Sequence, residues 1–528
     1  MKSFLKFGLA MNKRPVPWVL IVFCLLAFYA RTPAAPLADD YSPVNQDETR
    51  RLIKQADKLV RYNELVKAEE ILRNVLQASP ENSTAKLRLA YVLLKQRRLI
   101  EAFNLCDQVG ATDPKNTRAL ALMGAALLAA GKFTDARNYF YTAIKLNRRE
   151  GLAWAGYGLL DFYENRIDES IKNLKNATIL DPFEPDFIFA LAQVSARAER
   201  YKEAADAYFK FLSVSRGDTD DRRERIKGLI RFLRFLGNKS KLYEASGPEK
   251  TSVPILLTGN RPIISVKVNG GKDTLNFVLD TGSGISVISD ETAARLKIKP
   301  IARGGQAKGI GGDGKFDIIY GFLKDVQIGE VKIRNVPVYI RPFHSRGFDI
   351  DGYIGLSLIS KFLTTIDYGN LSFSLLKRGT EAEKAFDETA MSLPLRLTSS
   401  GFLSGEVKLE GIEYPLNFIV DTGASISVIS NDLASVHPVS QFEQNEKLRV
   451  VGSAGIEENV PSFILPQVSF GVHSRRSVDA VALDLDVINE ASGFEQAGIL
   501  GGNFLRNYRM TFDFKNSRVS FSPVSREQ

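Results

Sequence analysis

Two aspartates in the second half of the chain stand in nearly identical surroundings. Asp280 lies in the stretch FVLDTGSGISVIS, residues 277–289, and Asp421 lies in FIVDTGASISVIS, residues 418–430. Each aspartate ends an apolar strand, and the Asp-Thr-Gly turn that follows can present its carboxylate at a surface or an interface. Two such carboxylates that converge cannot both ionise cheaply, so they share one proton. The pair can then activate water and polarise a carbonyl group, which is general acid–base hydrolysis.

The aspartate motif belongs to a longer duplication. GYIGLSLISKFLTTIDYGN, residues 352–370, returns as GILGGNFLRNYRMTFDFKN, residues 498–516. Short runs of Val, Ile, Leu and Phe, punctuated by glycine, indicate β structure throughout this part of the chain. The pattern therefore predicts two homologous all-β lobes, residues 253–378 and 390–525, joined by a polar segment.

On these motifs both lobes resemble the retropepsin-type aspartic proteases, the family of the retroviral proteases. A subunit of that family carries two hydrophobic residues before Asp-Thr-Gly-Ala/Ser, then a glycine-rich flap, then a hydrophobic-hydrophobic-Gly segment. The first lobe matches with Asp280, Thr281, Gly282 and Ser283, followed by Ile354-Gly355. The second lobe matches with Asp421, Thr422, Gly423 and Ala424, followed by Leu500-Gly501.

The resemblance implies a catalytic pair, Asp280 and Asp421, that forms between two paired lobes. Thr281 and Thr422 would cross-link the two active-site loops by hydrogen bonds, with the neighbouring motif residues as loop support. The two lobes pair within one chain, or each lobe pairs with its copy in another molecule. The expected flap and substrate-binding residues are Gly309, Ile310, Gly311, Gly312, Val451, Gly452 and Ser453. Because the second flap holds fewer glycines, the sequence leaves open which lobe closes over a peptide.

Three smaller features of the lobes allow further predictions. Ser283 occupies the position in the first motif that Ala424 occupies in the second. If the Ser283 hydroxyl donates a hydrogen bond to Asp280, Asp280 would be the ionised partner and Asp421 the protonated one. Asp367 and Asp513, at matching positions, are expected to form turns. Residues 309–314 also satisfy the G-x-G-x-x-G pattern of dinucleotide sites, but the strand-like residues that follow argue against that function.

The first half of the chain carries a shorter repeat. Pro80, Pro114 and Pro182 fall on one 34-residue register, the period of the tetratricopeptide repeat (TPR). Small residues recur where the two helices of a repeat must approach closely, at Ala56, Ala90, Gly124, Gly158 and Ala192. We expect five repeats over residues 49–216 and a superhelix whose concave face binds a peptide or a protein partner. The alternative is that the array only spaces or solubilises the lobes.

Residues 217–250 are predicted to be a capping helix and a linker. Arg223–Gly237 places apolar residues on one helical face and basic residues on the others. A basic amphipathic helix can lie on a membrane surface, but a repeat array also needs a terminal helix with one polar face. We favour the cap.

The N-terminus, residues 1–38, resembles an export signal. A basic stretch ends at Lys13-Arg14, and an apolar run follows from Pro15 to Ala30. The segment is either a cleaved signal peptide or a retained membrane anchor, because no clean cleavage site follows the apolar run. We therefore expect an extracytoplasmic protein, periplasmic or secreted, or anchored to the inner membrane, with no membrane contact beyond this segment.

Composition limits the function classes. The 528 residues carry a net charge of +9, but the first 35 residues hold five basic and no acidic side chains, which leaves +4 for the rest. Nucleic-acid binding therefore has little electrostatic support. The two cysteines and three histidines have no spacing typical of disulfide scaffolds, metal sites or a Ser-His-Asp triad. We expect neither a metal nor another cofactor.

These observations predict an all-α TPR superhelix followed by two all-β retropepsin-like lobes. The function we expect is an exported aspartic endopeptidase whose repeats recruit a peptide or protein substrate. The alternative function is a non-catalytic adaptor, in which the protease-like lobes bind a peptide without cleaving it.

Overall fold

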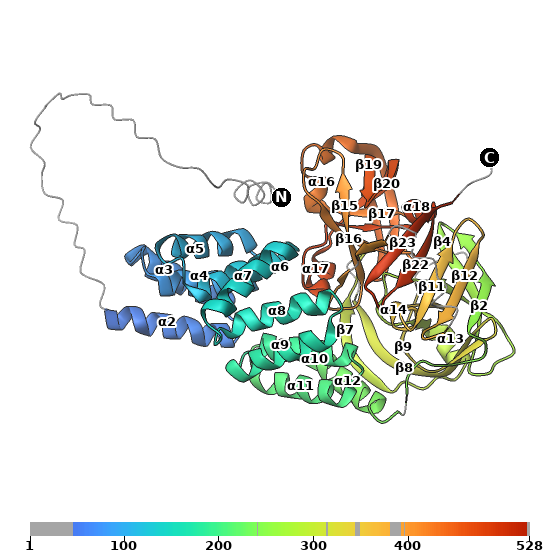
Figure 1. Cartoon of the computed structure of the whole chain (residues 1–528), viewed down its shortest axis with the longest axis horizontal. Helices are drawn as coiled ribbons and strands as arrows, with labels where there is room; N and C mark the ends of the chain where they lie inside the picture. The colour runs from blue at the N-terminus through green and yellow to red at the C-terminus, as the bar shows by residue number, and fades with distance from the viewer. Residues whose placement is uncertain are drawn as a thin grey trace, which may run out of the picture.

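A computed structural model describes residues 46–239, 241–312, 315–343, 349–380, 392–394 and 396–524. It places a helical half beside a β-rich half (Figure 1). The predicted export segment, residues 1–38, lies outside the described residues. Within the described ranges, no helix combines the length and the apolar character that crossing a membrane requires.

Five antiparallel helix pairs form the first half, as the 34-residue register predicts. Their second helices begin at residues 34 apart, and Gly124 of α6 lies so close to α7 that an added Cβ would be 2.8 Å from the Phe140 ring. The array begins at Gln46, slightly earlier than the predicted residue 49. The pairs are α2 (Gln46–Arg61) with α3 (Leu65–Ala78), α4 (Ser83–Lys95) with α5 (Leu99–Thr112), α6 (Thr117–Ala129) with α7 (Phe133–Leu146), α8 (Gly151–Tyr163) with α9 (Ile167–Leu180), and α10 (Pro185–Arg197) with α11 (Tyr201–Val214).

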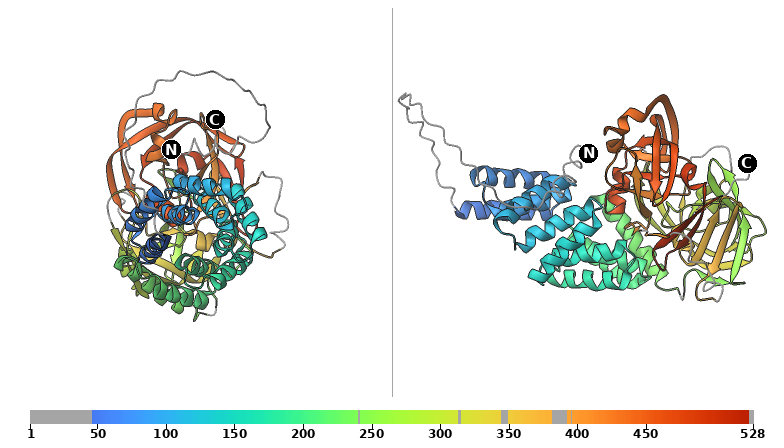
Figure 2. Two further views of the ribbon diagram at one scale, coloured as in Figure 1. Left: turned by 90° about the vertical axis from the view of Figure 1, so that its left-hand side faces the viewer. Right: turned by 45° about the horizontal axis from the view of Figure 1, so that its top comes forward.

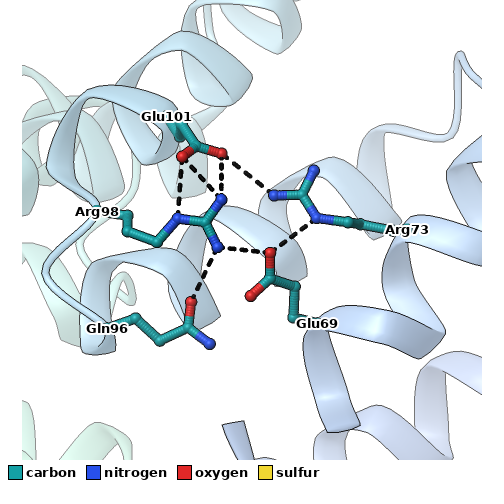
Figure 3. A network of polar contacts seen from close by, with 5 residues as sticks. All are labelled: Glu69, Arg73, Gln96, Arg98 and Glu101. Carbon is teal, nitrogen blue, oxygen red and sulfur yellow. Dashed lines mark hydrogen bonds and ion pairs between the residues drawn. The ribbon is translucent and has the colours of Figure 1, made fainter. Parts of the chain in front are cut away.

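Ion pairs connect neighbouring repeats on the outside of this packing. Arg98, at the start of α5, reaches Glu69 of α3 with an Nη1–Oε1 distance of 2.6 Å, and Arg73 of α3 reaches Glu101 of α5 at 3.1 Å (Figure 3). The Gln96 side chain also accepts a hydrogen bond from Arg98. Single exposed pairs contribute little to stability, but this network fixes the orientation of α3 against α5.

The array curves until distant repeats touch. An ion pair of 2.6 Å joins Lys95 Nζ at the end of α4 to Asp186 Oδ2 at the start of α10, and a Cβ on Gly217 would lie 2.0 Å from the Tyr62 carbonyl oxygen. Viewed along the array, the helices form a ring (Figure 2, left). The Tyr91 ring, contacted by Lys95 and Arg118, lies beside the same ion pair. The inner face predicted to bind a partner is therefore partly bridged by the chain's own side chains.

Helix α12 (Asp220–Leu236) joins the array to the first lobe. Ile226 and Ile230 pack against α10 and α11, whereas the Phe232 ring stacks on Tyr320 of the lobe at 4.5 Å between centroids. Arg231 donates to the carbonyl oxygen of Arg303 at 2.9 Å. Because its apolar side chains are covered from two sides, this helix has no apolar face left for a membrane surface.

The predicted linker after α12 is partly wrong. Within it, β1 (Glu244–Ser246) pairs with β9 (Val331–Arg341), and its last residue, Lys250, begins β2 (Lys250–Pro254), which pairs with β12 (Ser372–Lys377). Gly247 and Pro248 interrupt these short strands, so the local sequence looks like a connector. Backbone hydrogen bonds to strands that are distant in the sequence bring these residues into the sheets.

Each lobe is built on one large sheet. In lobe 1 the strand order is β1-β9-β6-β10-β5-β4-β8-β7, with β3 paired to β4, and in lobe 2 it is β14-β15-β16-β21-β17-β20-β19-β18. The lobe 1 strands not yet given are β3 (Leu256–Thr258), β4 (Arg261–Val268), β5 (Leu275–Leu279), β6 (Val287–Ser289), β7 (Ala302–Lys308), β8 (Lys315–Ile328) and β10 (Gly352–Ile354). The lobe 2 strands are β14 (Arg396–Leu397), β15 (Leu403–Leu409), β16 (Leu416–Val420), β17 (Ser427–Ser430), β18 (Glu443–Gly452), β19 (Gly455–Phe470), β20 (His473–Leu483) and β21 (Gly498–Leu500). The short α-helices in the described part of the lobes are α13 (Asp290–Arg295), α14 (Leu356–Ile359), α16 (Asn431–Ala434), α17 (Asp486–Ser492) and α18 (Gly502–Leu505).

A third sheet holds the two lobes together within one chain. Its order is β13 (Ser392–Pro394), β23 (Arg518–Pro523), β22 (Tyr508–Asp513), β11 (Phe362–Asp367), β12 and β2, so each lobe supplies three neighbouring strands. At its centre β11 and β22 run antiparallel, and the hydroxyls of Thr365 and Thr511 are 2.9 Å apart. This continuous sheet pairs the lobes within one molecule.

The turn prediction for the two remaining aspartates is confirmed. Asp367 accepts hydrogen bonds from the backbone amides of Gly369 and Asn370, each at 3.0 Å. Asp513 accepts from the amide and side chain of Asn516. Both carboxylates are therefore used in closing the turns that follow β11 and β22.

Candidate active site

The two Asp-Thr-Gly loops are held by equivalent strands. Asp280 follows β5, and its amide donates to the carbonyl oxygen of Ile354 at 3.0 Å; Asp421 follows β16, and its amide donates to that of Leu500 at 3.0 Å. The duplicated hydrophobic-hydrophobic-Gly segments thus fix the loops through β10 and β21. Gly355 and Gly501 lie so close to the loop backbones that an added Cβ would clash.

Thr281 and Thr422 cross-link the loops by four hydrogen bonds. The Thr281 hydroxyl donates to the Val420 carbonyl at 2.7 Å and accepts from the Thr422 amide at 3.0 Å. The Thr422 hydroxyl donates to the Leu279 carbonyl at 2.6 Å and accepts from the Thr281 amide at 3.2 Å. Both threonines are fully buried, so water does not compete for these bonds.

The two glycines of the loops bring the carboxyl groups together. A Cβ on Gly282 would lie 2.3 Å from Cγ of Asp421, and one on Gly423 would lie 2.7 Å from Oδ1 of Asp280 and 3.1 Å from Oδ1 of Asp421. Each glycine therefore leaves the space that the opposite carboxyl group fills. Each also donates its amide to its own aspartate, at 3.0 Å in lobe 1 and 2.7 Å in lobe 2.

Electrostatics favour one shared proton. Burial, followed by the charge of Asp421, raises the pKa of Asp280 well above its usual value, although the positive charge of Arg341 lowers it. Burial raises the pKa of Asp421 as well, whereas its hydrogen bond with Asp280 and several backbone amides lower it. Because burial raises the pKa of both carboxyl groups, we expect the pair to hold one proton between them.

Ser283 does not donate the hydrogen bond on which an ionised Asp280 was predicted. Its hydroxyl donates to the carbonyl oxygen of Ile285 at 2.9 Å, within its own loop. The hydrogen bond that would have stabilised an ionised Asp280 is therefore absent. A local carbonyl group competes successfully for the hydroxyl, a contact that residue type alone does not reveal.

The flap hairpins of the two lobes contact each other at their tips. Hairpin β7–β8 carries Gly309 to Gly312 at its tip, and hairpin β18–β19 carries Val451, Gly452 and Ser453. The Ile310 amide donates to Ser453 Oγ at 3.1 Å, and the Ile310 carbonyl accepts from the Ala454 amide at 3.1 Å. The lower glycine content of the second flap therefore does not prevent its closure.

The glycines of the first flap permit this contact. Gly311 and Gly312 have φ angles of 74° and 106°, which side-chain-bearing residues rarely adopt. A Cβ on Gly452 would lie 2.1 Å from the Ile310 carbonyl oxygen. Val451 is partly exposed at the edge of its hairpin and forms no part of the bond between the tips. After the first tip the chain continues as strand β8, not as the helix that a dinucleotide site requires.

Three residues near the site are absent from the sequence-based prediction. Ser286 and Ser427 accept hydrogen bonds from the amides of Gly355 and Gly501, both at 3.1 Å, and so brace the two loops equivalently. Their repetition in the duplicated motif was a usable signal. Arg341, which donates to the Ser453 carbonyl at 3.1 Å, has no counterpart in the duplication, so no such signal existed.

The structure has the features of an aspartyl protease domain, namely two homologous β lobes, one shared sheet, a pair of convergent aspartates and two flaps that contact each other. Residues 264–358 and 405–504 each match the family model "Aspartyl protease". Two TPR family models match residues 59–126, 93–160 and 158–211. The chain thus combines a duplicated aspartyl protease region, retropepsin-like in both halves, with an N-terminal TPR module.

Several proteins are similar to part of this chain. Anaphase-promoting complex subunit 3 of Schizosaccharomyces pombe is 23% identical over 160 residues, which cover 30% of this chain and 24% of that protein. A BBSome complex member BBS4 homolog of Drosophila melanogaster is 24% identical over 180 residues, covering 31% and 37%. A thermophilic TPR protein of Thermus thermophilus matches 34% of this chain and 98% of its own at 21% identity, with a TM-score of 0.30. The chain therefore spans well under half the length of the two curated relatives.

Proposed function

We propose that this protein is an exported aspartic endopeptidase. The observation that carries the proposal is the convergence of Asp280 and Asp421 across the two cross-linked loops, each beside the other lobe's glycine. The duplicated family match supports the same activity. Export follows from the basic and apolar pattern of residues 1–38.

In the proposed mechanism, a water molecule lies between the carboxyl groups. The ionised member of the pair takes a proton from this water, whose oxygen attacks the scissile carbonyl carbon, while the protonated member donates its proton to the carbonyl oxygen. Collapse of the tetrahedral intermediate breaks the C–N bond, and the leaving amine receives a proton from the pair. The flaps exclude bulk water during these steps.

The TPR array recruits the substrate or a partner in this proposal. Helix α12 contacts the first flap hairpin through Arg225, which donates to the Gln306 carbonyl at 3.1 Å, and Arg231, which donates to Arg303. A segment bound by the array is therefore held close to the cleft, which raises its local concentration there.

Cleavage of a peptide library by the full chain, beside Asp280→Asn and Asp421→Asn, tests the activity. One site formed by both lobes predicts that either variant alone loses turnover by several orders of magnitude, because neither remaining carboxyl can both accept and donate a proton. Two independent homodimeric sites would leave about half of the activity in each variant.

The same experiment distinguishes the protease function from the adaptor function. If the wild type binds peptides but cleaves none between pH 3 and 8, a range that spans the ordinary carboxyl pKa values and neutrality, the protein is a peptide-binding adaptor and the protease proposal is wrong.

A further inference from the structure

The two halves of the cleft carry different chemistry at equivalent positions. In the sheet registers, Arg341 pairs with Ser289 as Leu483 pairs with Ser430. Tyr353 lies opposite Val278 as Ile499 lies opposite Ile419. Arg261 precedes Ile263, which faces Val278, and Phe402 precedes Ser404, which faces Ile419, by the same two positions. Lobe 2 thus has Leu483, Ile499 and Phe402 where lobe 1 has Arg341, Tyr353 and Arg261.

Arg341 lies at the junction of the flap, the aspartates and lobe 1. Besides its hydrogen bond to the flap residue Ser453, its guanidinium lies 5.3 Å from the ring centre of Phe316 and 5.9 Å from that of Phe343. Its charge also acts on Asp280. The side chain is half-buried, and among the described residues no Asp or Glu forms an ion pair with it.

Arg261 adds a second guanidinium to this side of the cleft. Its Nε is buried and has no hydrogen-bond partner within the described part of the chain. Both guanidiniums and both aspartates are near enough to Tyr353 for their charges to act on its hydroxyl, and the Tyr353 ring meets Phe343 edge-on at 5.0 Å. A buried donor without a partner is costly unless a ligand satisfies it.

The equivalent positions in lobe 2 hold apolar side chains. Leu483 and Ile499 belong to one buried cluster, against which Phe402, Ala424 and the flap residue Ile310 also pack. A charged substrate group placed there would lose its water without gaining a partner.

We propose that lobe 1 binds an acidic side chain of the substrate through Arg341 and Arg261, whereas lobe 2 binds an apolar side chain on the other side of the scissile bond. This inference rests on the proposed protease function and names its substrate class. A carboxylate would form charge-assisted hydrogen bonds with two guanidiniums that form no ion pair with any Asp or Glu among the described residues. The asymmetric lobes also fix the direction of the peptide, because reversal would bring the acid to the apolar surface.

Cleavage-site profiling with paired peptide libraries, in which one position at a time holds Glu or its neutral isostere Gln, tests this proposal. We expect the wild type to prefer Glu at one position on one side of the cleaved bond by about 10- to 100-fold in kcat/KM. Arg341→Gln should remove most of this ratio, and Arg341→Lys should keep part of it. The control Arg334→Gln, on the same strand but paired with Glu244 at the surface, should leave the ratio unchanged.

The Glu-to-Gln ratio isolates recognition from the other contacts of Arg341. Loss of the Ser453 hydrogen bond or a changed pKa of Asp280 alters the cleavage of both libraries equally. Cleavage without a Glu preference, or a preference that survives Arg341→Gln, would overturn the subsite and leave the protease function standing.

Binding of the same libraries to the full-length Asp280→Asn/Asp421→Asn double variant, followed by fluorescence anisotropy, gives a readout without turnover. If the wild type cleaves nothing but the double variant binds Glu peptides more tightly in an Arg341-dependent manner, the carboxylate subsite stands and the hydrolytic function fails. Equal binding of both libraries would refute the subsite.

Discussion

The protonation of the two active-site aspartates depends on the residues that surround them. Two aspartates become a shared-proton pair because two glycines leave room for them and two threonines fix the loops. The same confinement makes ionisation costly, since burial and the neighbouring charge raise the pKa of Asp280. The site is therefore expected to reduce the stability of the fold at neutral pH.

Asp280→Asn should stabilise the protein at neutral pH. Because the pKa of Asp280 is raised on folding, the folded state holds this proton more tightly than the unfolded state, and stability falls as pH rises from about 4 through the raised value. The neutral amide avoids this loss, by about 1.4 kcal/mol for each unit of the shift. Thermal unfolding at several pH values measures the difference, which should vanish below pH 4. A variant that is less stable than the wild type at pH 7 would contradict this account.

The flap hairpins and helix α12 control access to the two aspartates. The flap hairpins meet through backbone groups of Ile310 and Ala454 and the Ser453 hydroxyl, so closure depends on close approach of the two tips. Helix α12 supports the first hairpin from outside, and a Cβ on Gly228 of this helix would lie 2.2 Å from the Arg303 carbonyl. Flap position is therefore coupled to the packing of the last helix of the array.

Gly452→Ala should hinder flap closure with little effect on folding. The added methyl group would overlap the Ile310 carbonyl oxygen, which forces the tips apart. Displacement of this size lowers kcat/KM by about 10²-fold, whereas the midpoint of thermal unfolding should barely change because the tip lies outside the cores.

Gly110→Ala is the matched control for the flap variant. No atom lies within 4 Å of a Cβ added to Gly110 in α5, so activity should be unchanged, with a gain in stability of up to about 1 kcal/mol. Equal activities of the two variants would show that contact between the tips does not limit turnover.

The whole molecule behaves as one docked assembly of array and lobes (Figures 1 and 2). Phe494 of lobe 2 is completely buried among array residues, with its ring centre 4.9 Å from that of Phe133 and 5.0 Å from that of Tyr163. Arg197 of α10 donates to the carbonyl oxygen of Thr398 and lies over the Phe162 ring. The array therefore contacts lobe 2 directly, and it contacts lobe 1 through α12 and through an ion pair between Glu199 and Lys361.

Phe494→Ala should loosen the array from lobe 2. Truncation of a fully buried phenylalanine costs about 3–5 kcal/mol, and here the loss falls on the contact between the two halves. We expect calorimetry to show a lower first transition that separates from the unfolding of the lobes. Phe183→Ala is the control, since Phe183 is 79% exposed and should change stability by less than about 0.5 kcal/mol. A single unshifted transition in Phe494→Ala would mean that the halves are not coupled here.

Local patterns in the chain were sufficient for much of this architecture. The 34-residue register predicts five helix pairs, and the duplicated motifs predict two β lobes with Asp280 and Asp421 at strand ends, because these features depend on residue type and short-range spacing. The turns at Asp367 and Asp513 follow from the same local chemistry.

Only the tertiary structure decided that the lobes pair within one chain, that both flaps meet, and that Ser283 binds its own loop. It also placed Arg341 beside the flap residue Ser453 and closed the array into a ring through Lys95 and Asp186. These outcomes depend on contacts between groups far apart in the sequence or on competition among several hydrogen-bond partners, and neither leaves a periodic trace in the chain.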